Sequence, residues 1–174
     1  MVAALAVLLF SPALASADNL SINDFRGIWR GAELAAPTTG SSVPRTLQDL
    51  DMKILPLEDG RIEMAWYTSM PLNDADKNSD AMNATLLTFT PSDHPGVWHA
   101  LSAWRDYSDE VAVWARLAGR TLTVYHMIVE ANGAFRMNIY RRTLAGSKIV
   151  FEYTYLRDGK VQSVAVGDLL PETR

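Results

Sequence analysis

Apolar and polar side chains alternate along most of the chain, which predicts β-strands. The alternating segments are rich in Val, Ile, Tyr, Phe and Thr, the residue types that pack well on a pleated sheet. No window keeps the helical period over three turns. The pattern therefore predicts ten strands, near residues 25–34, 47–55, 61–69, 84–90, 97–104, 110–117, 121–129, 134–143, 148–156 and 161–169.

Five short turn signals separate strand segments, and each of them contains Gly. Asp or Asn precedes the Gly in three of them, which is typical of two-residue hairpin turns. We therefore expect segment 121–129 to pair with 134–143, and 148–156 with 161–169, as antiparallel hairpins. The signals are Glu58-Asp59-Gly60, Ala118-Gly119-Arg120, Ala131-Asn132-Gly133, Ala145-Gly146-Ser147 and Arg157-Asp158-Gly159.

A series of strands with short links and no covering helices must bury its apolar faces against itself. The stable arrangements are a closed barrel and a two-layer sandwich. Consecutive hairpins favour neighbours that run up and down, and closure removes the exposed edges of a long sheet. The sequence therefore predicts an all-β fold, an antiparallel up-and-down β-barrel of about eight to ten strands.

Three segments have a clear apolar row, which predicts an aromatic and Met-rich interior when that row turns inward. The rows are Ile62, Met64 and Trp66, then Phe135, Met137 and Ile139, and then Ile149, Phe151, Tyr153 and Tyr155. The row that alternates with the second of them is Arg136, Asn138, Tyr140 and Arg142. Segment 121–129 is mostly apolar on both faces, so it is either covered on its outside or faces a ligand.

Two segments between strands have the composition of loops, residues 35–45 and 71–83. Loops of this length either line one mouth of a barrel or are surface excursions without a task. Within the second loop, Asp74 to Asp80 place oxygen ligands at alternate residues, as Ca²⁺ requires. Because Ser79 replaces the turn glycine and Thr85 replaces the bidentate Glu of such sites, a solvated acidic loop is favoured.

The beginning of the chain has the pattern of a secretory signal. Val2 to Phe10 is continuously apolar, Pro12 interrupts it, and Ala15-Ser16-Ala17 has the small residues of a cleavage site. We therefore expect residues 1–17 to be removed and residues 18–174 to form a single barrel domain. No Lys or Arg precedes the apolar run, so either the amino group supplies the positive charge or translation starts upstream of Met1.

The composition of the chain argues against several classes of binding partner and chemistry. The formal net charge is −4, which gives no electrostatic reason to bind nucleic acid or an anionic membrane surface. The absence of Cys excludes disulfides, a thiol nucleophile and a lipid anchor on Cys. These features fit a periplasmic or secreted bacterial protein that does not insert into a membrane after signal cleavage.

The segment from Phe25 to Gly31 contains Gly27 and Trp29 at the start of the first predicted strand. This Gly-x-Trp motif resembles the opening motif of lipocalin-like barrels. The run from Trp114-Ala115-Arg116 through Tyr140-Arg141-Arg142-Thr143-Leu144 is similar to exported proteobacterial proteins of unknown function. The resemblance implies that Trp29 closes the narrow end of the barrel and packs on a basic side chain. The candidates for that basic side chain are Arg141, Arg142 and Arg157.

Catalytic residues are scarce, so enzymatic activity is the less favoured interpretation. No two of His94, His99 and His126 have the spacing that places two metal ligands on one face of an element. His126 has the surroundings of a hydrogen-bonded interior histidine rather than of a catalytic base. There is no Gly-x-Ser-x-Gly motif and no phosphate-binding Gly-rich loop. No cofactor and no metal site are expected.

The favoured function is binding of a small, largely apolar molecule inside the barrel. The small residues Ala100 and Ser102 lie between Trp98 and Trp104, which leaves a slot for a flat ligand or lets the large rings interlock with their neighbours. The candidate ligand-binding residues are Met64, Trp66, Trp98, Trp104 and His126, with Trp98 and Trp104 near the mouth of a cavity. The alternative is a structural or interaction domain of the cell envelope with a filled core. An enzyme with polar groups around His126 or His99 is a third possibility.

Overall fold

All ten predicted strands form in the computed structural model, which describes residues 20–31, 50–71, 80–100 and 110–172. Within these residues one helix is present, the 3-10 helix η1 (Ile22–Phe25), which precedes the strands. The strands are β1 (Gly27–Gly31), β2 (Leu50–Pro56), β3 (Ile62–Pro71), β4 (Asp80–Pro91), β5 (Val97–Ala100), β6 (Glu110–Ala118), β7 (Thr121–Val129), β8 (Phe135–Ala145), β9 (Lys148–Arg157) and β10 (Lys160–Pro171).

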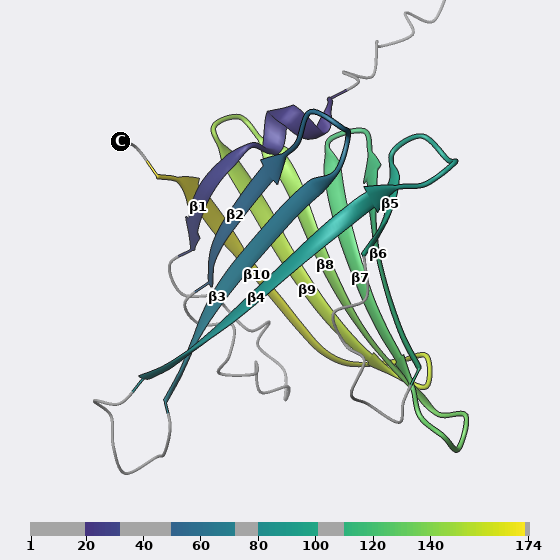
Figure 1. Ribbon diagram of the computed structural model, residues 1–174. Coiled ribbons are helices and arrows are strands. Elements are labelled where there is room, and N and C mark those ends of the chain that lie inside the picture. The colour runs from purple at the N-terminus through teal and green to yellow at the C-terminus, as the bar shows by residue number, and fades with distance from the viewer. Residues whose placement is uncertain (1–19, 32–49, 72–79, 101–109, 173–174) are drawn as a thin grey trace, which may run out of the picture.

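Each strand pairs antiparallel with its neighbour in the sequence, and β1 pairs with β10 to close the barrel. The arrangement is the predicted all-β up-and-down barrel (Figure 1). Over the described residues, β1 and β10 share three register pairs, from Trp29↔Pro171 to Gly31↔Leu169. By contrast, β8 and β9 are paired over ten residues.

The two hairpins expected at Asn132-Gly133 and Asp158-Gly159 are confirmed, since β7 pairs with β8 and β9 with β10. Asp158 and Gly159 both have positive φ, 49° and 75°. Two successive residues with positive φ make the type I′ turn, whose twist matches that of the flanking strands. Asp158 also accepts a hydrogen bond from the Phe135 N–H through Oδ1 at 2.9 Å, which ties this turn to the start of β8.

Two predicted boundaries were wrong. Pro71 belongs to β3, and residues 80–83 belong to β4, so the predicted loop over 71–83 is shorter than expected. The reason is that β3 and β4 pair over ten residues, from Ile62↔Phe89 to Pro71↔Asp80, and ladder hydrogen bonds override a polar composition. The predicted signal peptide, the loop over 35–45, Trp104 and most of the acidic string at 74–80 lie outside the described residues.

The interior face of β8 was also predicted wrongly. Arg142 is the register partner of Leu122 on one side and of Phe151 on the other, and both of these are completely buried. The inward row of β8 is therefore Arg136, Asn138, Tyr140, Arg142 and Leu144, and the row of Met137 and Ile139 faces outward. The cause is the register of the two-residue turn at Gly146-Ser147, because a side chain's face follows from its partner across the ladder.

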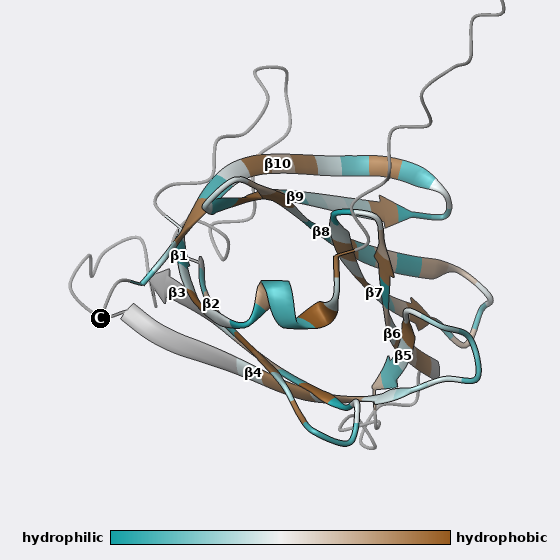
Figure 2. Ribbon diagram, turned by 90° about the horizontal axis from the view of Figure 1, so that it is seen from above, coloured by the Kyte–Doolittle hydropathy of each residue, from teal (hydrophilic) through white to brown (hydrophobic). Residues whose placement is uncertain are grey.

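The core is densest at the end of the barrel where η1 lies. η1 lies across this opening when the barrel is viewed along its axis (Figure 2). Phe25 is completely buried there, and Leu20 and Ile22 pack against the core. Arg26 donates from Nη2 to the carbonyl oxygen of Pro56 at 2.8 Å, which holds η1 on the end of β2. We call this the covered end, and the opposite end, where the β7–β8 and β9–β10 turns lie, the far end.

Candidate ligand-binding site

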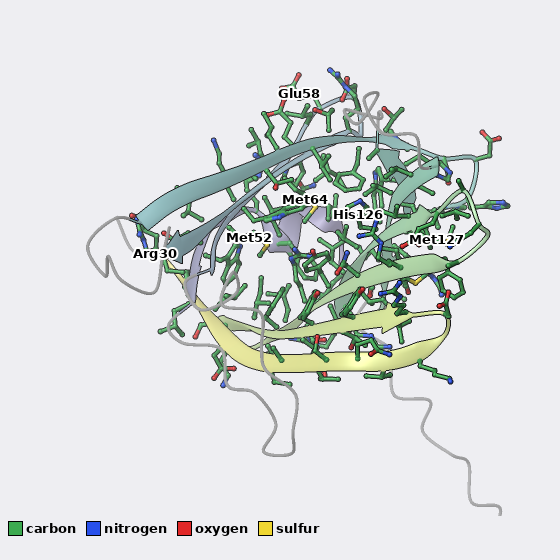
Figure 3. All side chains as sticks on the ribbon, turned by 90° about the horizontal axis from the view of Figure 1, so that it is seen from below. Arg30, Met52, Glu58, Met64, His126 and Met127 are labelled. Atoms are coloured by element: carbon green, nitrogen blue, oxygen red, sulfur yellow. The ribbon has the colours of Figure 1, made fainter. Side chains whose placement is uncertain are left out.

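The structure places the described candidate residues at different levels of the barrel. Met64 and Trp66 lie in the inward row of β3, and His126 lies in the inward row of β7. Viewed from below, Met52, Met64 and His126 lie within the ring of strands (Figure 3). Met64 is completely buried, whereas Trp66 and His126 are half-buried. These three residues are therefore brought to the interior as expected.

Gly27 and Trp29 belong to the covered end. The Trp29 indole N–H donates to the carbonyl oxygen of Phe25 at 3.0 Å, and Trp29 is only 6% exposed. Gly27 has φ of +146°, and a Cβ there would lie 3.7 Å from Nε1 of Trp29. The backbone conformation therefore favours glycine here, whereas a Cβ would make only an ordinary contact with the indole ring.

The stacking of a basic residue on Trp29 is not found among the described residues. The guanidinium of Arg142 contacts the rings of Trp66, Tyr140 and Phe151 instead. Met52, the register partner of Trp29, accepts the hydrogen bond from Arg142 Nε at 2.7 Å. Arg142 therefore hydrogen-bonds to Met52, beside Trp29, while the tryptophan ring that it contacts is that of Trp66.

Trp98 lies at the covered end as well. Its indole N–H donates to the carbonyl oxygen of Gly60 at 2.9 Å, in the turn between β2 and β3. Trp98 is 8% exposed and packs in the core, so the prediction that it lies near a ligand-accessible mouth is not supported by its contacts. The large ring interlocks with its neighbours, which was the alternative drawn from its spacing with Trp104.

Four aromatic side chains from β3, β8 and β9 meet inside the barrel, and we call them the aromatic cluster. Tyr140 is at its centre, with ring centroids 5.3 Å from Tyr153, 6.0 Å from Trp66 and 6.4 Å from Phe151. Tilted rings at these separations attract each other through their quadrupoles. Burial raises the pKa of both tyrosines, so both phenols are neutral near neutral pH.

Arg142 is the charged member of this interior. Its guanidinium is 1% exposed and lies 5.6 to 5.9 Å from the ring centroids of Phe151, Tyr140 and Trp66. Burial lowers the pKa of Arg142 to about 10, and the neighbouring Tyr140 opposes this shift, so the group stays cationic at neutral pH. Its hydrogen-bond acceptors are the Met52 sulfur and the carbonyl oxygen of Tyr140, the latter at 3.3 Å from Nη1.

A polar row crosses four adjacent strands on the side of the aromatic cluster nearer the far end. Its members are register neighbours: His126 on β7, Asn138 on β8, Tyr155 on β9 and Ser163 on β10. Tyr153 donates from its hydroxyl to Asn138 Oδ1 at 2.8 Å, which links the row to the cluster. The Ser163 hydroxyl is buried and has no hydrogen-bond partner among the described residues.

His126 is the imidazole of the polar row. Burial is the main cause that lowers its pKa, and the positive charge of Arg136 lowers it further. The imidazole is therefore neutral near neutral pH and can donate one hydrogen bond and accept another. Within the described residues, no group of three or more His, Asp or Glu side chains is arranged to hold a metal ion.

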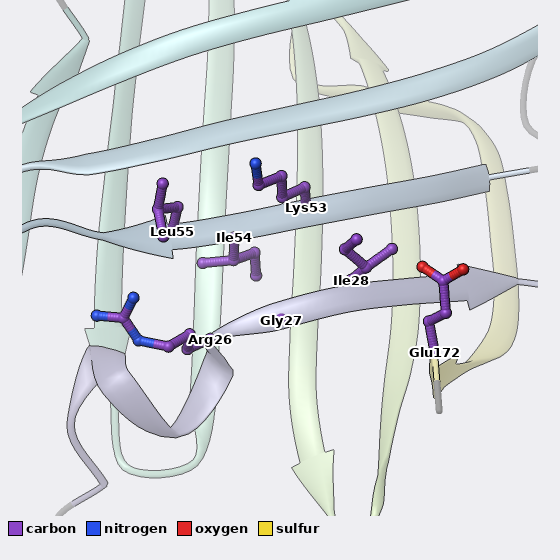
Figure 4. Close-up of a pocket in the computed structure, with 7 residues that line it drawn as sticks. All are labelled: Arg26, Gly27, Ile28, Lys53, Ile54, Leu55 and Glu172. Carbon is purple, nitrogen blue, oxygen red and sulfur yellow. The ribbon is translucent and has the colours of Figure 1, made fainter. Parts of the chain in front are cut away.

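Two pockets on the outer surface lie away from these residues. One, of about 440 Å³, lies beside the β1–β2 pair and is lined by Arg26, Lys53, Glu172 and four apolar or glycine positions (Figure 4). The other, of about 620 Å³, lies at the β1–β10 seam, where Arg30 forms ion pairs of 2.8 Å with Asp51 and Glu172. Exposed pairs of this kind contribute little stability and are screened by salt.

Sequence reasoning missed the roles of Asn138, Tyr140, Arg142, Tyr153 and Ser163 at this site. One signal was available for β8. A two-residue turn at Gly146-Ser147 pairs position 142 with 151, and Phe151 was already expected to face inward. Because side chains alternate along a strand, Tyr140 and Asn138 face inward together with Arg142. The polar row and the buried arginine follow from that register.

Comparison with known proteins finds no family that matches the chain and no curated relative. In the described part of the chain, no helix has the length and hydropathy needed to cross a membrane.

Proposed function

We propose that the protein binds a small, largely apolar molecule inside the barrel, and that the molecule enters from the far end. The observation that carries the proposal is a gradient of burial along the interior. Phe25, Met64 and Phe151 have no exposed surface, whereas the inward-facing Trp66 and His126 are half-buried. A core filled along its whole length would bury these two side chains as fully as the others.

The chemistry of the interior suits a ligand of this kind. The partly buried rings of Trp66 and Tyr140 offer apolar and polarisable surface. The polar row offers a few hydrogen-bonding groups at one level, including the unpartnered hydroxyl of Ser163. Ligand sites in proteins combine an apolar wall with a small number of placed polar groups.

The proposal includes export. A signal peptide over residues 1–17 would deliver the mature chain, from Asp18 onward, to the periplasm or the medium. The resemblance of Gly27 and Trp29 to the opening motif of lipocalin-like barrels is in keeping with a ligand-binding protein of this kind. Sequencing the N-terminus of the exported protein tests the cleavage, and an intact Met1 would disprove it.

Ligand binding is tested by titrating the purified protein with fatty acids, isoprenoids and aromatic compounds. A bound molecule in contact with the aromatic cluster should change tryptophan emission saturably, and it should raise the melting temperature because only the folded state binds it. Mass spectrometry of small molecules that co-purify with the protein would identify natural candidates. A protein that neither retains nor responds to any compound would contradict the proposal.

Two neighbouring variants localise the site. Trp66→Ala removes an inward-facing ring and should weaken binding at least about ten-fold, which corresponds to about 1.4 kcal/mol. Glu63→Ala, on the outward row of the same strand, should leave the affinity unchanged. Equal effects of the two substitutions would place the site elsewhere.

Exposed apolar side chains on the outer surface of the barrel support a second candidate function. The large apolar side chains of Leu86, Val161 and Leu170 are 64%, 60% and 58% exposed. Exposed apolar groups are typical of surfaces that bind other proteins, although single ones are common on any protein. A structural or interaction domain of the envelope is therefore the alternative. Cross-linking in intact cells that captures one partner, together with no response to small molecules, would favour it.

A further inference from the structure

We infer that the molecule bound in the barrel carries a carboxylate, and that this carboxylate binds the guanidinium of Arg142. The inference rests on the proposed function and adds the chemical class of the ligand and its orientation. It starts from the position of Arg142, which is buried beneath the core of the covered end and surrounded by rings.

Burying a cation is costly unless an anion and hydrogen-bond acceptors compensate for the lost water. No carboxylate lies within ion-pair distance of Arg142 among the described residues. On the described strands, the carboxylates whose side chains are placed belong to Asp51, Glu63, Glu152 and Asp168, and all of them lie in outward rows. The described interior therefore carries a positive charge that no described carboxylate neutralises.

The guanidinium also has unused donors. Of its five N–H groups, two are engaged, one with the Met52 sulfur, a weak acceptor, and one with the carbonyl oxygen of Tyr140. Neither hydrogen of Nη2 has an acceptor among the described residues. The ring faces of the aromatic cluster stabilise the cation but accept no strong hydrogen bond. An acceptor supplied by a ligand would use these donors.

A carboxylate fits this arrangement better than a more highly charged group. Arg142 supplies one positive charge, and one carboxylate neutralises it without leaving excess charge in the interior. The planar guanidinium matches the two oxygens of a carboxylate in geometry. The rings of Trp66 and Tyr140 lie beside the guanidinium and are only partly buried, so they suit the hydrocarbon part of the same molecule.

The inward row of β8 gives a route from the far end to Arg142. It presents Arg136, Asn138 and Tyr140 in succession before Arg142. Arg136 and Arg157 are register partners near the far end, where Arg136 pairs with Glu130 at 3.1 Å and Arg157 is exposed. Positive charge at an entrance raises the rate at which anions arrive. An entering carboxylate would therefore meet hydrogen-bonding groups along its path.

The test compares dodecanoate with dodecan-1-ol, which shares its tail and lacks the charge. By calorimetry or tryptophan emission, the unaltered protein should bind dodecanoate at least about ten-fold more tightly, as a charge-assisted hydrogen bond allows. Arg142→Met should abolish this preference. Arg141→Met, the same change on the adjacent outward residue beside Glu152, should retain it.

A second measurement needs no variant and decides the question if Arg142→Met fails to fold. Dodecanoate labelled with ¹³C at its carboxyl carbon is titrated with acid while bound to the unaltered protein, and its NMR shift is followed. Beside Arg142, the bound carboxylate should stay ionised at pH values that protonate the free acid. In an apolar site without a cation, burial would instead make the carboxylate protonate at a higher pH than the free acid.

The outcomes separate the two proposals. Equal binding of dodecanoate and dodecan-1-ol, a preference that survives in Arg142→Met, or a bound carboxyl that protonates at a higher pH than the free acid would overturn the carboxylate inference. Each of these leaves ligand binding in the barrel intact. If neither compound binds, and no other molecule of the panel does, the proposed function fails and the inference fails with it.

Discussion

At the scale of single residues, a buried arginine and a half-buried histidine have different tasks in the interior. Arg142 keeps its charge although it is buried, because three rings and two hydrogen bonds offset part of the desolvation. His126 is kept neutral, because burial and the charge of Arg136 both oppose its protonation. The described interior thus combines a fixed cation with a neutral donor and acceptor.

His126 predicts a pH dependence of stability. Its pKa is lowered below the ordinary value of 6.5 in the folded state, so between the two pKa values the unfolded chain binds more protons. The free energy of unfolding should therefore fall as pH falls below 6.5 and continue to fall until the folded pKa is passed. Urea denaturation at a series of pH values between about pH 5 and about pH 7.5 measures this slope.

Two glutamine variants isolate the contribution of this histidine. His126→Gln should flatten the slope near pH 6.5, while His99→Gln, at an exposed position of β5, should not change it. An identical pH profile for His126→Gln and the unaltered protein would show that other groups cause the dependence.

At the scale of elements, the last four strands are joined by long ladders, with one register shift between Val161 and Ser163 in β10. The β7–β8, β8–β9 and β9–β10 pairs have nine, ten and nine register pairs. Short Gly-containing turns join them, and these turns determine which side chains face inward. The aromatic cluster and the polar row are built mainly on this part, so the candidate site rests on the strands with the longest ladders.

The β9–β10 turn gives a prediction for a single element. Gly159 has φ of +75°, where a residue with a Cβ is strained, so Gly159→Ala should lower the free energy of unfolding by about 1 kcal/mol. Asp158→Asn is the matched control, because Asn tolerates positive φ and keeps an oxygen for the Phe135 N–H. Thermal denaturation compares the two. A larger loss in Asp158→Asn than in Gly159→Ala would contradict this account of the turn.

At the scale of the whole molecule, the barrel is paired unevenly around its circumference. Within the described residues, the β1–β10, β4–β5 and β5–β6 pairs have three register pairs each, and β3–β4 has ten. η1 covers one end of the barrel and brings Phe25 into the core. Among the described residues, the amides of β1 and β5 therefore have the fewest ladder partners.

Hydrogen exchange should reproduce this unevenness. Local opening exposes amides with few ladder neighbours first, so amides of β1 and β5 should exchange faster than those in the middle of β8 and β9. Exchange followed by mass spectrometry on the free protein measures the order. Dodecanoate, if bound, should slow exchange mainly in β8 and β9, and slower exchange in β1 alone would place the ligand elsewhere.

Much of the fold was predictable from the sequence, and less of the candidate site. The number of strands, their approximate bounds and the glycine turns at positions 60, 119, 133, 146 and 159 follow from local patterns. The inward positions of Met64 and Trp66 follow from alternation, whereas that of His126 depends on the register of β7, because both faces of this strand are mostly apolar. The face of β8 was predicted wrongly because apolar Met137 and Ile139 compete with the polar row for the interior, and only the register with Phe151 decides between the two rows.

The sequence by itself determined what depends on neighbouring residues: the period of two in each strand, and the turns, whose glycines adopt positive φ. Only the tertiary structure decided which side chains meet across the barrel. Arg142 reaches Met52, which is 90 residues away in the chain, and Trp98 reaches Gly60 in a turn at the covered end. Such contacts depend on how the sheet closes and on the stagger of its strands, which are properties of the whole barrel and not of any one segment.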